Sequence, residues 1–436
     1  MNENFNIFIN KKILIYGIGK SGISTFKFLK KYNNVSIFDD NKKINLNDYL
    51  KNRLISFGEI KKNKFDAIII SPGINTNKCK LKNFLKKNLK IIYTDLDVFY
   101  SFYKNQCITI TGTNGKSTTC KLLYEVLKKN SLDVKLAGNI GYPILSIKNI
   151  KRKSIFVIEA SSYQLDYSQL FTSKYAAILN ISPDHLERHK TLRNYILAKL
   201  KLIRNQKKDS VAFINKHDKY LKKEIKKNKF KSKIIKVETK LKNKIIKSFQ
   251  NNYLSSISNK ENLAFVIEIA KKFRIQRNLL RKVTKNFKGL KYRQQVIFDN
   301  KNISVINDSK STSYSSSIEI LKKSKNIYWL LGGIPKKGDK FNLPKKYFKN
   351  IKGFIFGRKY KKFSIDLKSK IKFKKFSNLK NALIGVLNEI RKDDSTKKTI
   401  LLSPAAASFD SFRNFEDRGS YFNKIIKDYL EVKSIV

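Results

Sequence analysis

A chain of 436 residues, 41% of them hydrophobic, exceeds one ordinary compact domain and suffices for several buried cores, so we expect about three domains. Its 94 Lys and Arg against 33 Asp and Glu give a net charge of +61, but the basic residues are spread along the whole length as short Lys pairs. This distribution argues against a nucleic-acid-binding stripe, and three cysteines without a C-x-x-C pair argue against a disulfide framework or a zinc ribbon.

The sequence also bears on the protein's location. No apolar run is long enough to span a bilayer, and the first residues lack the pattern of a signal peptide. We therefore expect a cytoplasmic protein that is not embedded in a membrane, has no specific nucleic-acid partner and is a monomer.

The first predicted unit alternates strands and helices. Residues 13–16 are predicted to form a buried strand, 17–22 a tight turn and 21–31 a helix, and further strands are predicted at 35–38 and 67–70. This order is typical of an α/β domain with a parallel sheet.

The turn at residues 17–22 reads G-I-G-K-S-G and matches G-x-G-x-x-G directly after a strand, with Asp39 and Asp40 at the end of the next strand. Such a turn places nucleotide phosphates over backbone N–H groups at a helix N-terminus. NAD and a UDP-sugar both fit this description. A glycine turn that merely packs a strand on a helix fits it as well.

The alternation restarts with a strand at 108–110, a second glycine turn and a helix from Ser117, followed by strands near 155–158, 176–179 and 211–214. A second α/β unit is therefore expected.

Residues 111–118 of this unit read T-G-T-N-G-K-S-T, although Ile110 occupies the first glycine of the Walker pattern. Lys and Ser in a glycine loop between strand and helix are what a triphosphate and Mg²⁺ require. Lys116 would contact the β and γ phosphates, and Ser117 or Thr118 would offer a hydroxyl to Mg²⁺. The sequence therefore predicts ATP binding.

A third unit is predicted to begin near Lys291, after helices at 262–273 and 279–287 and a break at Gly289. Its predicted strands are 303–306, 327–331, 354–356 and 399–402.

The ATP loop and the motifs that follow it in order resemble the Mur ligase family over essentially the whole chain. The family's G-N-I-G, E-x-S-S-[FY]-Q-L and N-x-x-x-D-H-x-[DE]-R-H segments correspond to residues 138–141, 159–165 and 180–189. The resemblance implies an α/β fold of three domains. These are an N-terminal Rossmann-like domain for a UDP substrate (1–104), a central P-loop ATPase-like parallel-sheet domain for ATP (105–290), and a C-terminal Rossmann-like domain for an amino acid (291–436).

The third domain resembles the MurD type within this family. Residues 307–313 resemble N-D-S-K-A-T-N, 332–336 resemble G-G-x-x-K, and 401–410 with 414–419 follow the MurD-type C-terminal signature. The G-K-G-H-E and D-N-P-R segments of ligases that add meso-diaminopimelate or lysine are absent. The resemblance implies a ligase that uses ATP to add D-glutamate to UDP-N-acetylmuramoyl-L-alanine through an acyl phosphate. Such an enzyme would serve peptidoglycan synthesis, and with it cell shape and cell division.

The resemblance also implies roles for single residues. The implied ATP-binding positions are Gly112, Thr113, Asn114, Gly115, Lys116, Ser117, Thr118, Asn262, Arg293 and Asp308. The implied UDP-substrate positions are Gly19, Lys20, Ser21, Asp39, Ser71, Gly73 and Asn139. The implied D-glutamate positions are Thr312, Lys336, Ser408 and Phe415.

The implied catalytic residues are Lys116, Glu159, His185 and Lys199, and the implied metal ligands are Ser117, Glu159, His185 and Lys199. Two Mg²⁺ ions are expected. Lys199 matches the position of the family's carbamoylated lysine, and a carbamate would be an anionic oxygen ligand where an ammonium would be repelled.

The sequence departs from the family at two places, since Ser258 and Tyr292 stand where histidine is usual. Other functions stay open. Another Mur-type amino-acid ligase would keep the same motifs, whereas a nicotinamide oxidoreductase using residues 17–22 would leave the loop at 112–118 unexplained. A nucleic-acid-binding P-loop protein is suggested by the net charge alone.

Overall fold

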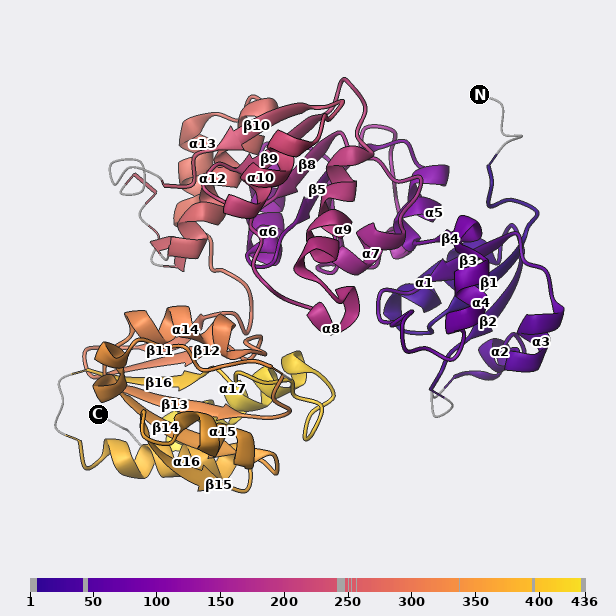
Figure 1. Ribbon diagram of the computed structural model, residues 1–436. Coiled ribbons are helices and arrows are strands. Elements are labelled where there is room, and N and C mark those ends of the chain that lie inside the picture. Colours follow the sequence, from indigo (N-terminus) through magenta and orange to yellow (C-terminus); the bar gives the residue numbers. More distant parts are fainter. Residues whose placement is uncertain are drawn as a thin grey trace. The chain divides into compact units, whose positions relative to one another are not determined.

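The computed structural model describes residues 6–41, 46–240, 248–249, 251, 253–255, 257–336, 338–393 and 397–432. The chain divides into two compact units, residues 1–287 and 288–436, so the boundary lies close to the predicted start of the third domain. Figure 1 shows two sheets in the first unit and one in the second, which confirms the predicted α/β class with one sheet for each expected domain. The division of the first unit at residue 104 stays a prediction. Within the described part of the chain, no helix is long and apolar enough to cross a membrane.

The N-terminal sheet has four parallel strands in the order β2-β1-β3-β4. Its elements are β1 (Lys12–Tyr16), α1 (Lys20–Leu29), β2 (Asn34–Phe38), α2 (Asp48–Lys51), α3 (Phe57–Lys62), β3 (Ala67–Ile70), α4 (Lys82–Lys87), β4 (Ile92–Tyr93) and α5 (Asp95–Phe102). β1 and β3 read KILIY and AIII, and such continuous apolar runs are typical of parallel strands covered on both faces. The strand order reverses between β1 and β3, which is where sheets of this kind bind ligands.

The middle sheet has six parallel strands in the order β10-β9-β8-β5-β7-β6. Its strands are β5 (Gln106–Thr111), β6 (Val134–Gly138), β7 (Ile155–Glu159), β8 (Tyr175–Ile178), β9 (Val211–Asn215) and β10 (Lys233–Val237). Its helices are α6 (Lys116–Lys129), α7 (Ser162–Tyr167), α8 (Leu186–His189), α9 (Leu192–Arg204), α10 (Lys219–Lys227), α12 (Ile257–Lys272) and α13 (Arg277–Lys285). β5 lies between β7 and β8, so the predicted ATP loop leaves the sheet at its switch point.

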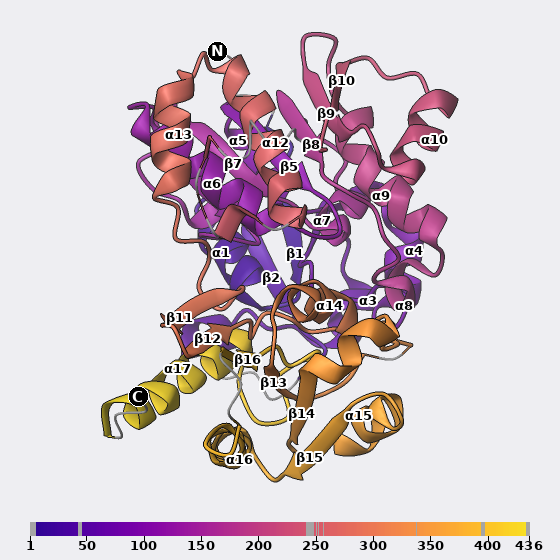
Figure 2. The ribbon, with the colours of Figure 1, turned by 90° about the vertical axis from the view of Figure 1, so that its left-hand side faces the viewer.

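Alternating side chains of β5 enter two different cores. Ile108 and Ile110 pack with α6, α12 and α13, which lie together in Figure 2, whereas Cys107 packs on the opposite side with α5, α7 and α9. α5 joins the N-terminal and middle sheets through this second core, because Leu96 and Phe99 belong to the same hydrophobic cluster as residues of β1 and β7. The Phe99 and Phe156 rings lie 4.7 Å apart between centroids.

The second unit has a six-stranded sheet in the order β11-β12-β16-β13-β14-β15, and β11 alone is antiparallel to its neighbour among these strands. Its elements are β11 (Gln295–Asp299), β12 (Ile303–Asn307), α14 (Tyr314–Lys323), β13 (Ile327–Gly332), β14 (Ile351–Phe356), α15 (Tyr360–Leu367), β15 (Lys372–Phe376), α16 (Leu379–Ile390), β16 (Lys398–Leu402) and α17 (Phe415–Val432). The three MurD-type motifs follow β12, β13 and β16, so their loops meet at one edge of this sheet.

Candidate active site

The first glycine turn joins β1 to α1 at the switch point of the N-terminal sheet. Gly17 has a φ of 97°, and a Cβ at Gly22 would lie 1.9 Å from the Gly17 carbonyl oxygen, so neither position accepts a side chain. α1 begins at Lys20 with Gly19 as its N-cap, and a Cβ at Gly19 would meet open space. The first N–H groups of α1 have no intrahelical acceptors, an arrangement that suits nucleotide phosphates.

Two further predicted UDP-substrate residues form hydrogen bonds to the backbone of this turn. Asp39, just after β2, accepts a hydrogen bond from the Ile18 N–H at 2.7 Å. Ser71, just after β3, is buried and donates its hydroxyl to the Gly17 carbonyl at 2.6 Å. A Cβ at Gly73 would meet open space. The structure therefore brings the predicted residues of the N-terminal sheet to one edge, and there Asp39 and Ser71 fix the shape of the turn.

The ATP loop is held against the segment that follows β8. The N–H of Thr113 donates to the Asn180 carbonyl at 2.9 Å, and the N–H of Asn114 donates to the Asn180 side chain at 2.9 Å. The Thr113 hydroxyl accepts from the Ser182 N–H at 3.0 Å and lies 3.1 Å from the Tyr195 hydroxyl. β5 runs through Ile110 to Thr111, both buried strand residues, so the loop begins at Gly112, two residues after the first glycine position of the Walker pattern.

Ser117 and Glu159, two predicted metal ligands, meet at the start of α6. The Ser117 hydroxyl donates to Glu159 Oε2 at 2.6 Å, and both side chains are buried. Glu159 ends β7 beside the ATP loop, and its carbonyl accepts from the N–H of Asn139, which is exposed after β6. An oxygen-bearing side chain from the first turn of α6 and another from the end of β7 thus converge at the helix N-terminus where a triphosphate would lie.

The two predicted catalytic lysines lie on either side of the same loop. Lys116 Nζ donates to the carbonyls of Gly112 and Thr113 at 2.9 and 2.7 Å. Lys199, on α9, is 1% exposed and its Nζ donates to the Gly112 carbonyl at 2.9 Å and to Thr111 Oγ1 at 3.3 Å. Burial, and after it the charge of Lys116, holds the pKa of Lys199 well below its usual value. This environment therefore favours the neutral amine of Lys199 over the ammonium, relative to an exposed lysine.

His185 lies near this cluster. It is the N-cap of α8 with a φ of 55°, and its side chain is 35% exposed between Asp184 and Glu187. Its ring centroid lies 6.4 Å from that of Tyr195, whose ring also faces Lys199 Nζ at 4.6 Å. Tyr195 was not predicted as a site residue, although it stands four residues before Lys199 on the same face of α9.

Arg188 joins the His185 segment to the loop that carries Ser71 and Gly73. Its guanidinium stacks over the Tyr163 ring at 3.8 Å and donates to the Pro72 carbonyl at 2.6 Å. Arg188 was also missed as a site residue. Its place inside the motif at 180–189 was visible in the sequence, whereas its burial appears only in the fold.

Gly115 provides a test of the ATP loop. It has a φ of 84°, and a Cβ there would lie 2.1 Å from Asn262 Oδ1, so Gly115→Ala combines a left-handed backbone with a clash. The backbone cost alone is roughly 1–2 kcal/mol, so we expect the Kd for a non-hydrolysed ATP analogue to rise about tenfold or more. Calorimetric titration measures this change.

Gly58→Ala is the matched control, because Gly58 has no positive φ and its nearest neighbour would be Ser56 Oγ at 3.8 Å. An unchanged affinity in Gly115→Ala would show that ATP does not bind at this loop.

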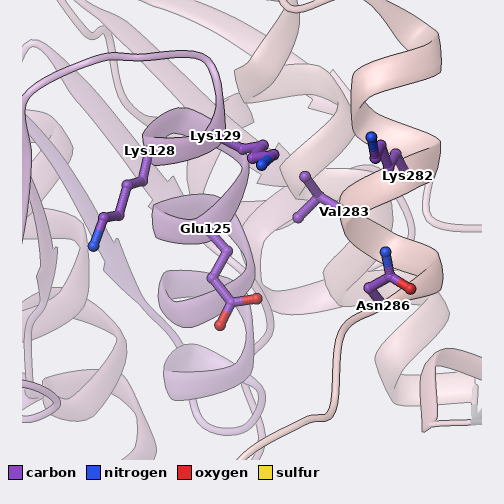
Figure 3. Close-up of a pocket in the computed structure, with 6 residues that line it drawn as sticks. All are labelled: Glu125, Lys128, Lys129, Lys282, Val283 and Asn286. Carbon is purple, nitrogen blue, oxygen red and sulfur yellow. The ribbon is translucent and has the colours of Figure 1, made fainter.

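A separate cavity of about 440 Å³ opens at the other end of α6, against α13. Figure 3 shows Val283 between the two helices, with Glu125, Lys129, Lys282 and Asn286 around it. No predicted site residue lines this cavity, so the candidate site is defined by the loops at the strand ends.

In the second unit, Asp308 is the buried centre of the loops that follow β12 and β16. Its Oδ1 accepts from the Gln294 N–H at 3.1 Å and its Oδ2 from the Ser403 hydroxyl at 3.0 Å. Burial raises the pKa of Asp308 to about 7, and these hydrogen bonds and Arg293 oppose the rise. Arg293 and Asp308, both predicted ATP-binding residues, therefore lie close enough for their charges to interact.

The guanidinium of Arg418 holds these loops together through hydrogen bonds. It is fully buried on α17 and donates to Ser309 Oγ at 3.0 Å, to the Ser309 carbonyl at 2.8 Å and to the Ala406 carbonyl at 3.0 Å. Arg418 was not predicted as a site residue, because its partners lie up to 109 residues away in the sequence. Burial lowers the pKa of Arg418 to about 10, and the residue stays charged.

The predicted D-glutamate residues belong to the same loops. Phe415 begins α17, its carbonyl accepts from the Ser309 hydroxyl at 2.8 Å, and Lys310 Nζ lies 3.9 Å from its ring centroid. Ser408 is buried, and Thr312 and Lys336 are partly buried. The loops of Lys336 and Ser408 are paired through backbone hydrogen bonds between Ile334 and Ala407.

Comparison with known proteins agrees with this arrangement. Residues 11–93 match the family description "Mur ligase MurD-like, N-terminal domain", and residues 110–281 match "Mur ligase middle domain". The chain is 36% identical to the UDP-N-acetylmuramoylalanine--D-glutamate ligase of Rickettsia felis, with 98% of this chain and 99% of the relative covered. It is 38% identical to the ligase of the same name from Buchnera aphidicola, over 98% and 99% of the two chains.

Solved structures share the fold at lower identity. The UDP-N-acetylmuramate-alanine ligase of Thermotoga maritima superposes with a TM-score of 0.57 at 17% identity, over 97% of this chain and 100% of the other. The MurF ligase of Thermotoga maritima in complex with ADP gives a TM-score of 0.56 at 14% identity, over 98% and 100% of the two chains. The solved structures show the shared fold, and the match to the curated ligases at 36% and 38% identity over 98% of the chain shows that it belongs to the Mur ligase family, on its MurD branch.

Proposed function

We propose that this chain catalyses the ATP-dependent addition of D-glutamate to UDP-N-acetylmuramoyl-L-alanine, in the cytoplasmic synthesis of peptidoglycan precursors. The observation that carries the proposal is the match to D-glutamate ligases along 98% of the chain, including the loops after β12, β13 and β16. We further propose that the protein acts as a monomer and needs no nucleic acid.

Each substrate has a site of matching chemistry. The N-terminal turn at Gly19 to Ser21 offers helix N–H groups to the UDP phosphates. The loop from Gly112 to Thr118 holds the ATP phosphates, with Asn262 against Gly115. In the second unit, Lys336, Thr312 and Ser408 supply a cation and hydroxyls for the carboxylates of D-glutamate, and Phe415 forms an apolar wall.

Mg²⁺ fits the side chains around the ATP loop. Among the described residues, no group of three or more His, Cys, Asp and Glu side chains forms a ready metal cage. Ser117 and Glu159 nevertheless present two oxygens at the loop, and Mg²⁺ commonly completes its shell with substrate phosphates and water. Glu159, Ser117, His185 and a carbamoylated Lys199 would hold the ions, which would neutralise phosphate charge.

The reaction begins with transfer of the γ-phosphoryl group of ATP to the terminal carboxylate of the UDP substrate, which yields ADP and an acyl phosphate. Lys116 stabilises the charge of the transferred group, since its ammonium already lies over the loop. The amine of D-glutamate then attacks the acyl carbon, and phosphate leaves as the amide forms. These residues contribute chiefly alignment and charge neutralisation.

The amino acid specificity is tested by measuring phosphate release from ATP and Mg²⁺ with UDP-N-acetylmuramoyl-L-alanine. We expect release with D-glutamate and none above background with L-glutamate, L-alanine or meso-diaminopimelate. Release with a different amino acid would move the chain to another Mur-type specificity, and no release with any of them would overturn the proposed activity.

A further inference from the structure

Asp95 connects two parts of the first unit that bind different substrates. It is the first residue of α5, the helix between the N-terminal and middle sheets, and it is 5% exposed. Its Oδ2 accepts from the Ser21 hydroxyl at 2.5 Å, and its Oδ1 accepts from Gln164 Nε2 at 3.0 Å. Ser21 belongs to the UDP turn, and Gln164 lies on α7, which begins three residues after Glu159.

The amide of Gln164 is held in one orientation. Its Oε1 accepts from the N–H of Ser161 at 3.2 Å and from the Ser161 hydroxyl at 3.1 Å, in the capping box that starts α7. An amide flip would lose both of these hydrogen bonds, so the Nε2 group must point at Asp95. Asp95 therefore supplies acceptor oxygens to both Gln164 and Ser21. Asparagine can turn its oxygen to Gln164 only by facing its amide nitrogen to Ser21, which removes the charge and reverses that hydrogen bond, and an apolar side chain serves neither partner.

Burial of the Asp95 carboxylate costs free energy. The ion pairs found in the described part of the chain include none to Asp95, and burial raises its pKa while the Ser21 and Gln164 hydrogen bonds oppose the rise. Asp97, two residues along the same helix, provides a comparison. Its Oδ1 accepts from Ser168 Oγ, at the C-cap of α7, at 2.8 Å and from the backbone N–H groups of residues 169–171. Asp97 therefore fixes the loop after α7, whereas Asp95 contacts the first turn of α7 and the UDP turn.

We propose that Asp95 is a positioning residue that holds the UDP turn and the segment of the metal ligand Glu159 in register through its shared hydrogen bonds. This inference rests on the proposed ligase reaction, in which the substrate carboxylate must lie in line with the γ-phosphate. It also changes the role of Ser21. The Ser21 hydroxyl proton is already donated to Asp95, so its side chain acts through Asp95 and only its backbone is left to serve the UDP phosphates.

Asp95→Asn tests the proposal in the full-length protein with D-glutamate, ATP and the UDP substrate. Each site keeps its own ligand contacts, so the KM values for ATP and the UDP substrate should change little. kcat should fall about tenfold or more, because a misplacement of about 1 Å can cost about 10²-fold in rate. A loss of ground-state binding alone would instead raise KM and leave kcat unchanged.

Ser168→Ala is the matched control for Ser21→Ala, because each removes one hydroxyl donor from an α5 carboxylate. We expect Ser21→Ala to lower kcat several-fold, Ser168→Ala to leave it unchanged, and Ser21→Ala to add nothing in the Asp95→Asn background. If Asp95→Asn does not fold, the comparison of kcat between Ser21→Ala and Ser168→Ala is sufficient to test the proposal.

Two results would overturn the role of Asp95. One is a kcat within about twofold of the wild type in Asp95→Asn, and the other is an equal loss of kcat in Ser168→Ala, which would indicate general destabilisation. The wild-type protein assayed in parallel separates these results from a failure of the ligase function, because an inactive wild type would contradict the function alone.

Discussion

Lys116→Met is expected to lower kcat/KM for ATP-driven ligation by about 10³-fold, which corresponds to roughly 4 kcal/mol of transition-state stabilisation. The Lys116 ammonium donates hydrogen bonds to the carbonyls of Gly112 and Thr113 at the start of α6. In this position it would contact a bound triphosphate. Methionine keeps most of the length of the side chain and removes the charge, so the loss would report electrostatic stabilisation of the transferred phosphoryl group. Steady-state phosphate release measures it.

Lys128→Met is the control, because Lys128 lies in the last turn of the same helix, next to the separate cavity. Its removal should leave kcat/KM within about twofold of the wild type. A similar loss in both variants would mean that the net charge of the helix matters more than the position of Lys116, and full activity of Lys116→Met would contradict an ATP site at this loop.

The sequence was sufficient to predict the strands at the centre of each sheet. β3 and β7 are buried along their length and β1 is buried from Ile13 to Tyr16, so each strand contains an unbroken apolar run, and the two glycine turns follow directly from β1 and β5. Two edge strands, β10 and β15, could not be predicted in the same way. β10 reads KIIKV and β15 reads KFKKF, and their exposed lysines conceal the alternation that identifies a strand.

Most of the predicted site residues lie in short motifs that are continuous in sequence. The ATP loop, with Lys116 and Ser117, forms one continuous motif, so the sequence predicts ATP binding before the fold is known. The roles of Asp95, which lies outside the motifs, and of Arg418, which lies inside the signature at 414–419, could not be found in this way. Asp95 meets Gln164 69 residues later, and Arg418 meets Ser309 109 residues earlier, so their roles exist only in the folded chain.

Lys199→Ala is expected to lower ligase activity by about 10²-fold or more, because the proposed carbamate of Lys199 would supply an anionic oxygen ligand to the predicted Mg²⁺ site and alanine cannot carry one. The unmodified amine is fully buried between Thr111 and Gly112, and its lowered pKa favours the neutral form. A neutral amine attacks CO₂ at carbon and releases one proton, which yields the carbamate. Small carboxylates such as acetate should therefore fill the space left in Lys199→Ala and restore part of the activity.

Lys201→Ala distinguishes this chemistry from burial alone. Lys201 lies two residues along α9, its pKa is also lowered by burial, and its Nζ donates to the Asp166 carbonyl at 2.8 Å, away from the ATP loop. We expect its removal to leave activity unchanged and acetate to have no effect on it. Removal of CO₂ from the wild type should lower activity, and bicarbonate should restore it. If neither CO₂ removal nor acetate changed activity, Lys199 would act as the neutral amine and the metal would need a different anionic ligand.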